Sequence, residues 1–300
     1  MHTSAGQRKL VLAGLAAGLI LLNLVTFIAA LPETSRIDSG CCSTHLLAKD
    51  FSAFYVGAWR LFSDPSNVYT PGAVSDGGPV ILPQPESYKY LPSFLVMVAP
   101  LLALGYQQAL TTFDLFQFLL LPLIAFLLYK LVGEKGLAVT AVVAVVVLFQ
   151  PLPIANWGLS ASYFWQWGEG QSKVFDTFLI LLALYLGKTN RPTASGVMLA
   201  LAAFDVRFAA LAIPLFIMYN RVNIRRAFLA LAVGFVISNA LLLYPPVGAG
   251  FVSMLFRTGL TTPLYYYALI PLLTVVSLTL VEIREIAAAL RGQKILTQLT

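Results

Sequence analysis

Long uncharged stretches alternate with short basic loops along most of the chain. Apolar runs without charge cover residues 10–32, 115–129, 136–168, 227–256 and 258–281, and shorter ones cover 177–187, 192–204 and 208–220. A helix needs about 20 apolar residues to cross the hydrocarbon of a bilayer, so the longer runs predict spanning helices. We therefore expect an all-α polytopic membrane protein with about eight transmembrane segments.

The composition supports a membrane protein and excludes several other classes. Hydrophobic residues make up 59% of the 300 residues and charged residues only 11%, with a mean hydropathy of +0.82. Soluble domains average about 45–50% apolar and about 25% charged residues. This surplus argues against a soluble enzyme, a nucleic-acid-binding domain or a disordered chain. The net charge of +6 comes from basic residues scattered between apolar blocks, which is typical of topology signals.

The distribution of Lys and Arg predicts the orientation of a single membrane domain. We place residues 1–9 in the cytoplasm, a first span at 10–31 and a long external loop at 33–106. The remaining spans follow within 107–283, and 284–300 form a cytoplasmic tail. This arrangement puts 12 of the 19 basic residues inside, while ten of the 13 acids share the outer half with the other seven. Such a bias is what the positive-inside rule expects.

Three segments call for special treatment in this topology. Residues 92–104 are too short for an ordinary span and contain Pro100, so we interpret them as re-entrant. Residues 193–219 are interrupted by Asp205-Val206-Arg207, which predicts two short helices meeting at a polar turn on the outer side. Residues 227–246 are expected to cross as one helix.

One face of the first external loop is apolar with helical spacing. The stripe consists of Phe51, Phe54, Tyr55, Ala58, Trp59 and Phe62. It predicts a helix that lies on the membrane surface. Asp50 directly precedes the stripe, so it is either the N-cap of this helix or a reactive carboxylate at the water–lipid boundary. The two interpretations are compatible, because the helix dipole keeps a capping carboxylate ionised.

Other polar and aromatic residues are candidates for a site. All four tryptophans, Trp59, Trp157, Trp165 and Trp167, fall on the expected outer side. They form either an interfacial belt or a platform for a sugar or lipid. Asp114, Asp176, Asp205 and Arg207 lie at membrane depth, where ionisable groups usually mark a pathway or a site. Asp205 and Arg207 either neutralise each other or leave the arginine to bind a phosphate.

Neither a metal nor a cofactor is expected. Cys41 and Cys42 are adjacent, and His45 is the only other candidate ligand nearby, which is too few for a structural metal site. We expect free thiols or an intermolecular bridge. The sequence also lacks a phosphate-binding Walker loop, a glycine-rich dinucleotide motif and a serine nucleophile elbow.

The order of motifs resembles a known family. The features are Asp50 followed by Phe54, Tyr55, Gly57 and Ala58; Tyr69; Tyr90 and Pro92 with Pro100-Leu101; Gly170-Gln171; and Ser195-Gly196 through Arg207. Over residues 10–245 the chain resembles the polyprenyl-phosphate-dependent membrane glycosyltransferases of the GT-C superfold, glycosyltransferase family 87. It departs from the family at Arg207-Phe208, where members usually carry Lys, often followed closely by Pro. Members commonly continue through further C-terminal spans, so a C-terminally short member is expected.

The resemblance implies an activity and a set of site residues. It implies a GT-C-like helical bundle that transfers a hexose or pentose, mannose-like, from a polyprenyl phosphate to a lipid or glycan acceptor with inversion. Asp50 matches the catalytic base, and Arg207 matches the cation on the phosphate side. The other expected substrate-binding residues are Tyr55, Tyr69, Tyr90, Glu169, Gln171 and Lys173. The expected partners are the lipid-linked donor, the acceptor and membrane lipids, with no nucleic acid and no cofactor.

Two alternative functions remain open from the sequence. A transporter of small molecules or lipids would usually show two related halves, whereas here only one half carries a long external loop. A non-catalytic membrane scaffold derived from such a transferase is the second alternative.

Overall fold

Every regular element in the described part of the chain is a helix. The computed structural model describes residues 5–34, 49–70, 88–134, 136–140, 170 and 172–257. The α-helices are α1 (Ala5–Thr34), α2 (Lys49–Ser63), α3 (Pro92–Val98), α4 (Tyr106–Val132), α8 (Lys173–Lys188), α9 (Pro192–Ala202), α10 (Val206–Asn220), α11 (Ile224–Ser238) and α12 (Pro245–Arg257). Short 3₁₀ helices are η1 (Pro65–Asn67), η2 (Ala99–Ala103), η3 (Arg221–Asn223) and η4 (Ala240–Leu243). The expectation of an all-α chain is confirmed over these residues.

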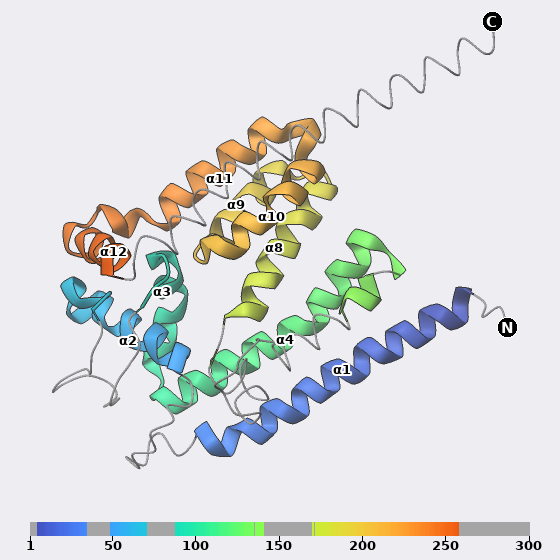
Figure 1. The fold of residues 1–300 in the computed structure, drawn as a ribbon, viewed down its shortest axis with the longest axis horizontal. Helices are drawn as coiled ribbons and strands as arrows, with labels where there is room; N and C mark the ends of the chain where they lie inside the picture. The colour runs from blue at the N-terminus through green and yellow to red at the C-terminus, as the bar shows by residue number, and fades with distance from the viewer. Residues whose placement is uncertain are drawn as a thin grey trace, which may run out of the picture.

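Helix α4 is the clearest candidate for a membrane span. Within the described residues it is the one helix both long enough and apolar enough to cross a bilayer, and a single such helix is weak evidence for a membrane protein. It matches the span predicted to begin at residue 107. Helix α1 runs antiparallel beside it, and Ile20 and Leu24 pack against the α4 face that contains Leu120 and Leu121 (Figure 1). The predicted span at 264–283 lies outside the described residues, and of the span at 137–156 only residues 137–140 are described, which are helical.

The apolar stripe on α2 is covered by protein. Phe51, Phe54, Tyr55 and Ala58 are buried in one cluster with side chains of α3 and α4, while Phe62 is 68% exposed. The helical spacing is therefore confirmed, but the expectation that this face rests on the membrane is wrong for most of its length. The reason is that α3, η2 and the start of α4 fold back over the same face.

The segment 92–104 begins and ends beside α2. Tyr88, just before the segment, packs against Gly57 of α2, and Leu104 at its end accepts a 2.7 Å hydrogen bond from the Tyr55 hydroxyl. Both ends of the segment therefore lie against the same short helix.

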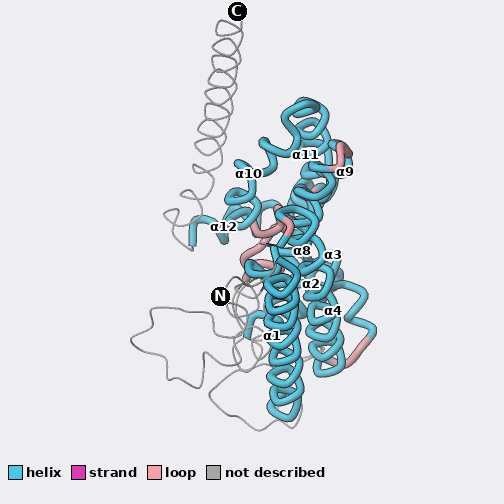
Figure 2. The backbone as a smooth tube through the Cα atoms, turned by 90° about the vertical axis from the view of Figure 1, so that its right-hand side faces the viewer, coloured by secondary structure: helices cyan, strands magenta, loops and turns pink. Residues whose placement is uncertain are grey.

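The prediction of two short helices for 193–219 is confirmed. Helix α9 ends at Ala202 and α10 begins at Val206, with Asp205 in the turn between them. This turn contacts the α2 and α3 region, since the Leu91 N–H donates to the Phe204 carbonyl at 3.2 Å. Figure 2 shows the helices from the side, with α9 beside α11.

The single helix predicted for 227–246 is divided. Helix α11 ends at Ser238, and η4 and an extended Tyr244 precede α12. At the end of α11 the Asn239 side chain donates from its Nδ2 to the Phe235 carbonyl at 3.0 Å. Pro245 and Pro246 then begin a new helix, and a proline disfavours the α conformation in the residue before it.

One end of the bundle collects helix ends and turns that carry seven exposed basic residues of the described ranges. Lys188 donates to the Leu131 carbonyl at 2.6 Å, and Lys9 donates to the Tyr129 hydroxyl at 3.1 Å, so the ends of α8, α4 and α1 meet. Helices α2 and α3 lie at the opposite end (Figure 1). The exposed cations of this basic end are Lys9, Lys130, Lys188, Arg191, Arg221, Arg225 and Arg226.

Candidate functional site

Asp50 lies in the first turn of α2, at the end of the bundle opposite the basic end. The helix begins at Lys49, two residues earlier than an N-cap role for Asp50 requires. Asp50 is half-buried. Its neighbour Phe51 is fully buried, with its ring centroid 5.6 Å from that of Tyr106 and 5.1 Å from that of Phe113. Asp50 is thus fixed to α4 through the residue that follows it.

Gly170, which lies just before α8, packs against the first turn of α2. It is buried with a φ of +63°, and a Cβ at this position would collide with the Cβ of Phe51. Only glycine combines this backbone conformation with such close contact. The first turn of α2, with Asp50, and the residues leading to Lys173 are consequently neighbours.

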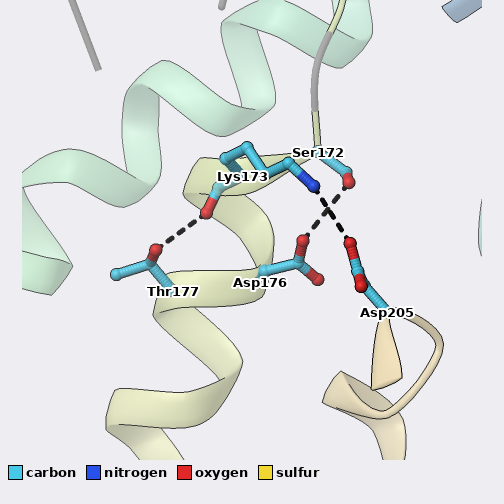
Figure 3. A network of polar contacts seen from close by, with 5 residues as sticks. All are labelled: Ser172, Lys173, Asp176, Thr177 and Asp205. Atoms are coloured by element: carbon cyan, nitrogen blue, oxygen red, sulfur yellow. Dashed lines mark hydrogen bonds and ion pairs between the residues drawn. The ribbon is translucent and has the colours of Figure 1, made fainter. Parts of the chain in front are cut away.

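Lys173 and Asp205 form an ion pair between α8 and the turn after α9. Lys173 Nζ lies 3.0 Å from Asp205 Oδ2. Figure 3 shows the lysine pointing from the first turn of α8 toward this carboxylate, beside a second contact in which Ser172 Oγ donates to Asp176 Oδ2 at 3.4 Å. In the sequence the nearest cation to Asp205 is Arg207, whereas the Lys173 partner is 32 residues away and follows no spacing rule.

Aromatic rings surround the ion pair. The Lys173 ammonium lies 5.7 Å from the ring centroid of Tyr90 and 4.5 Å from that of Phe208. Tyr69 is buried and donates its hydroxyl to the Tyr90 carbonyl at 3.3 Å. Of the expected substrate-binding residues, the structure therefore brings Tyr69, Tyr90 and Lys173 together.

Tyr88 is a buried residue that packs against Tyr69 and Tyr90 of this cluster. Its ring lies 5.6 Å from that of Tyr69 and 5.9 Å from that of Tyr90, and its hydroxyl donates to the Leu91 carbonyl at 2.6 Å. Burial raises the pKa of Tyr88 well above its ordinary value, so the phenol stays neutral and keeps donating. The sequence analysis did not select this residue.

Arg60 fixes the turn that precedes the undescribed part of the loop. Its Nη1 donates to the carbonyls of Asn67 at 3.1 Å and Thr70 at 2.6 Å. Desolvation lowers the pKa of Arg60 and the Asp64 carboxylate opposes this effect. Tyr69 lies between the two bonded residues, so Arg60 fixes the backbone on both sides of that tyrosine.

The remaining expected site residues are placed differently or lie beyond the described structure. Tyr55 is 1% exposed and donates its hydroxyl to the Leu104 carbonyl, so its visible role is to join α2 to the end of η2. Glu169 and Gln171 lie outside the described residues. Arg207 is in the first turn of α10, but its side chain is not among those described.

Two further carboxyl groups are buried in the helices. Asp114 of α4 is 2% exposed and Asp176 of α8 is fully buried. Gln117 of α4 accepts a hydrogen bond from the Phe175 N–H at 3.4 Å, which ties α4 to the first turn of α8. In the described residues no group of three or more His, Cys, Asp or Glu side chains is arranged to hold a metal ion. Cys41, Cys42, His45 and the tryptophans other than Trp59 fall outside these residues.

The arrangement offers a half-buried carboxylate and a partly exposed ammonium at one end of a helical bundle, with aromatic faces beside the ammonium. Comparison with protein-family models, curated proteins and solved structures finds no match for this chain.

Proposed function

We propose that the protein is an inverting, polyprenyl-phosphate-dependent membrane glycosyltransferase. In this proposal it spans the membrane about eight times with both termini in the cytoplasm. It transfers a mannose-like hexose or pentose to a lipid or glycan acceptor at the external face. The proposal rests on the motif order described above and on the local geometry around Asp50 and Lys173.

The observation that carries the proposal is the contact between Gly170 and Phe51. It joins the turn that carries Asp50 to the helix that carries Lys173, although more than a hundred residues separate them. Transfer from a lipid phosphate needs a carboxylate and a cation around one substrate, because the base acts on the acceptor while the cation stabilises the departing phosphate.

The proposed reaction is a single displacement. Asp50 accepts the proton of the acceptor hydroxyl as its oxygen forms a bond to the anomeric carbon. The bond between that carbon and the donor phosphate oxygen breaks on the opposite face, and its electron pair leaves with the phosphate. Arg207 and Lys173 supply positive charge for this leaving group, while Tyr69, Tyr90, Glu169 and Gln171 line the substrates. Tyr55 contributes by holding α2 in place.

The direct test uses the purified protein in lipid nanodiscs with radiolabelled polyprenyl-phosphate sugars and a panel of glycolipid acceptors. We expect label in the acceptor, equimolar release of polyprenyl phosphate, and an anomeric configuration opposite to that of the donor. No transfer from any hexose or pentose donor, combined with uptake of solute into vesicles containing the protein, would instead favour the transporter.

A further inference from the structure

The ion pair between Lys173 and Asp205 is strongly asymmetric in its exposure. The side chain of Asp205 is 2% exposed, whereas that of Lys173 is 19% exposed. A buried carboxylate is costly unless a cation and hydrogen bonds compensate it, so Asp205 is the fixed partner. Lys173 is the partner that reaches the surface of the cluster.

The surroundings of Lys173 restrict where its ammonium can lie. It is flanked by the faces of the Tyr90 and Phe208 rings, and Asp205 Oδ2 bonds it from the α9–α10 turn. A free lysine side chain populates many rotamers and loses entropy when it binds an anion. Here two distant segments, the one with Tyr90 and the one with Asp205 and Phe208, have already restricted those rotamers.

From this geometry we propose that Asp205 is a positioning residue which holds the Lys173 ammonium as the binding group for the donor phosphate. The inference rests on the proposed function and refines it, because it adds Asp205 to the phosphate site and gives this carboxylate a role other than neutralising Arg207. An ammonium has three rotatable donors, so it can bond a phosphate oxygen while Asp205 keeps it in place.

Removing the Asp205 charge should change phosphate binding in opposite directions, depending on whether Asp205 positions Lys173 or is merely a nearby charge, here called a bystander. A carboxylate beside a phosphate site repels the anion, so removing a bystander charge should tighten phosphate binding. Removing a positioning carboxylate should weaken binding even though the site becomes more positive. Asp205→Asn is nearly isosteric and therefore isolates this charge.

The experiment measures binding of undecaprenyl phosphate, with neutral undecaprenol as the reference ligand, to the full-length protein in nanodiscs. We expect Lys173→Gln to weaken binding of the phosphate at least about tenfold, as expected for loss of a charge-assisted bond. Asp205→Asn should weaken it at least about threefold, a smaller loss because the Lys173 charge survives. Neither variant should change binding of the alcohol.

Lys89→Gln is the matched control, because Lys89 is exposed beside Tyr90 and the substitution removes the same charge. It should bind the phosphate as the wild type does.

A charge exchange, Lys173→Asp with Asp205→Lys, separates stability from binding. The exchanged pair should recover most of the thermal stability that either single variant loses, yet it should bind the phosphate as weakly as Lys173→Gln does. Recovery of phosphate binding by the exchange would overturn the inference and make the pair structural. The single variants test the inference even if the exchanged protein does not fold. Asp205→Asn that binds the phosphate as tightly as the wild type or more tightly would overturn the inference. Unchanged phosphate binding in Lys173→Gln would overturn it as well.

Failure of the proposed function would look different. Wild-type protein that binds undecaprenyl phosphate through Lys173 but transfers no sugar would leave this site intact and remove only the transferase activity.

Discussion

Gly170 packs directly against Phe51, and this contact joins the two parts of the candidate site. Its φ of +63° and the space it leaves for the Phe51 side chain are both specific to glycine. Leu110 of α4 lies on the same side, so α2, α4 and the approach to α8 meet at a single residue. The position of Asp50 relative to Lys173 therefore depends on Gly170.

We expect Gly170→Ala to destabilise the protein and to lower transfer. The strained φ costs about 1–3 kcal/mol, and the collision with Phe51 adds about 1–3 kcal/mol because the surroundings are packed. Thermal unfolding in nanodiscs and initial rates of transfer measure the two effects. Gly133→Ala is the control for backbone strain without a collision, since Gly133 has a φ of +67° and a ψ of −141° but open space around a Cβ. It should lose stability, while its folded fraction keeps normal transfer. Equal loss of transfer in the two variants would show that the Phe51 contact adds nothing to the site.

The sequence predicted the local features of the fold well. Helical spacing located the apolar face of α2, and the polar residues at 205–207 located the break between α9 and α10. These features depend on neighbouring residues, which is why periodicity and charge reveal them. The burial of the α2 face was missed because its cover, α3 and the start of α4, is brought there by long-range packing.

The site was predictable only in part for the same reason. Lys173 and Tyr90 were selected from their motifs, but their contact with each other and with Asp205 joins three distant segments. Residue type gave no sign that Tyr88 is buried while Tyr90, two residues later, is only half-buried. Which of these side chains is buried depends on how α2, α3 and α8 pack together.

The orientation of the chain can be tested through its two native cysteines. We expect a membrane-impermeant maleimide to label Cys41 and Cys42 in intact cells, after mild reduction to open any disulfide, because the basic-residue bias puts residues 33–106 outside. In a variant lacking both cysteines, Thr193→Cys should be labelled only after lysis. Thr193 is exposed and lies in α9 near the basic end. The opposite labelling pattern would reverse the topology.

Substitution of Arg207 should affect donor binding and not stability, because Asp205 is already paired with Lys173. Because Asp205 is already bonded to Lys173, Arg207→Ala should leave thermal stability close to that of the wild type. It should raise the donor concentration needed for half-maximal transfer, while Arg207→Lys should retain part of the activity because the charge survives and the bidentate fork is lost. Transfer rates over a donor titration provide the measurement. Normal turnover of Arg207→Ala at low donor would remove Arg207 from the phosphate site.

The role of Asp50 as base makes the sharpest prediction about chemistry. Asp50→Asn preserves the shape of the side chain in the first turn of α2, but the amide cannot accept the proton of the acceptor hydroxyl. Transfer should fall by about two to four orders of magnitude, the usual contribution of a general base. Binding of undecaprenyl phosphate should stay unchanged, because the donor phosphate contacts other residues in the proposed site.

The comparison with Asp50→Glu tests position separately from charge. The longer side chain keeps a carboxylate but moves it by one methylene, so transfer should also be impaired through misplacement of the base. Each variant is assayed at equal abundance in membranes with labelled donor, and thermal unfolding confirms that α2 remains folded. Because Asp50 is half-buried at the helix start, a purely structural carboxylate would lose stability in Asp50→Asn while the folded fraction transferred normally. That outcome would move the catalytic base elsewhere, with Glu169 the first residue to examine.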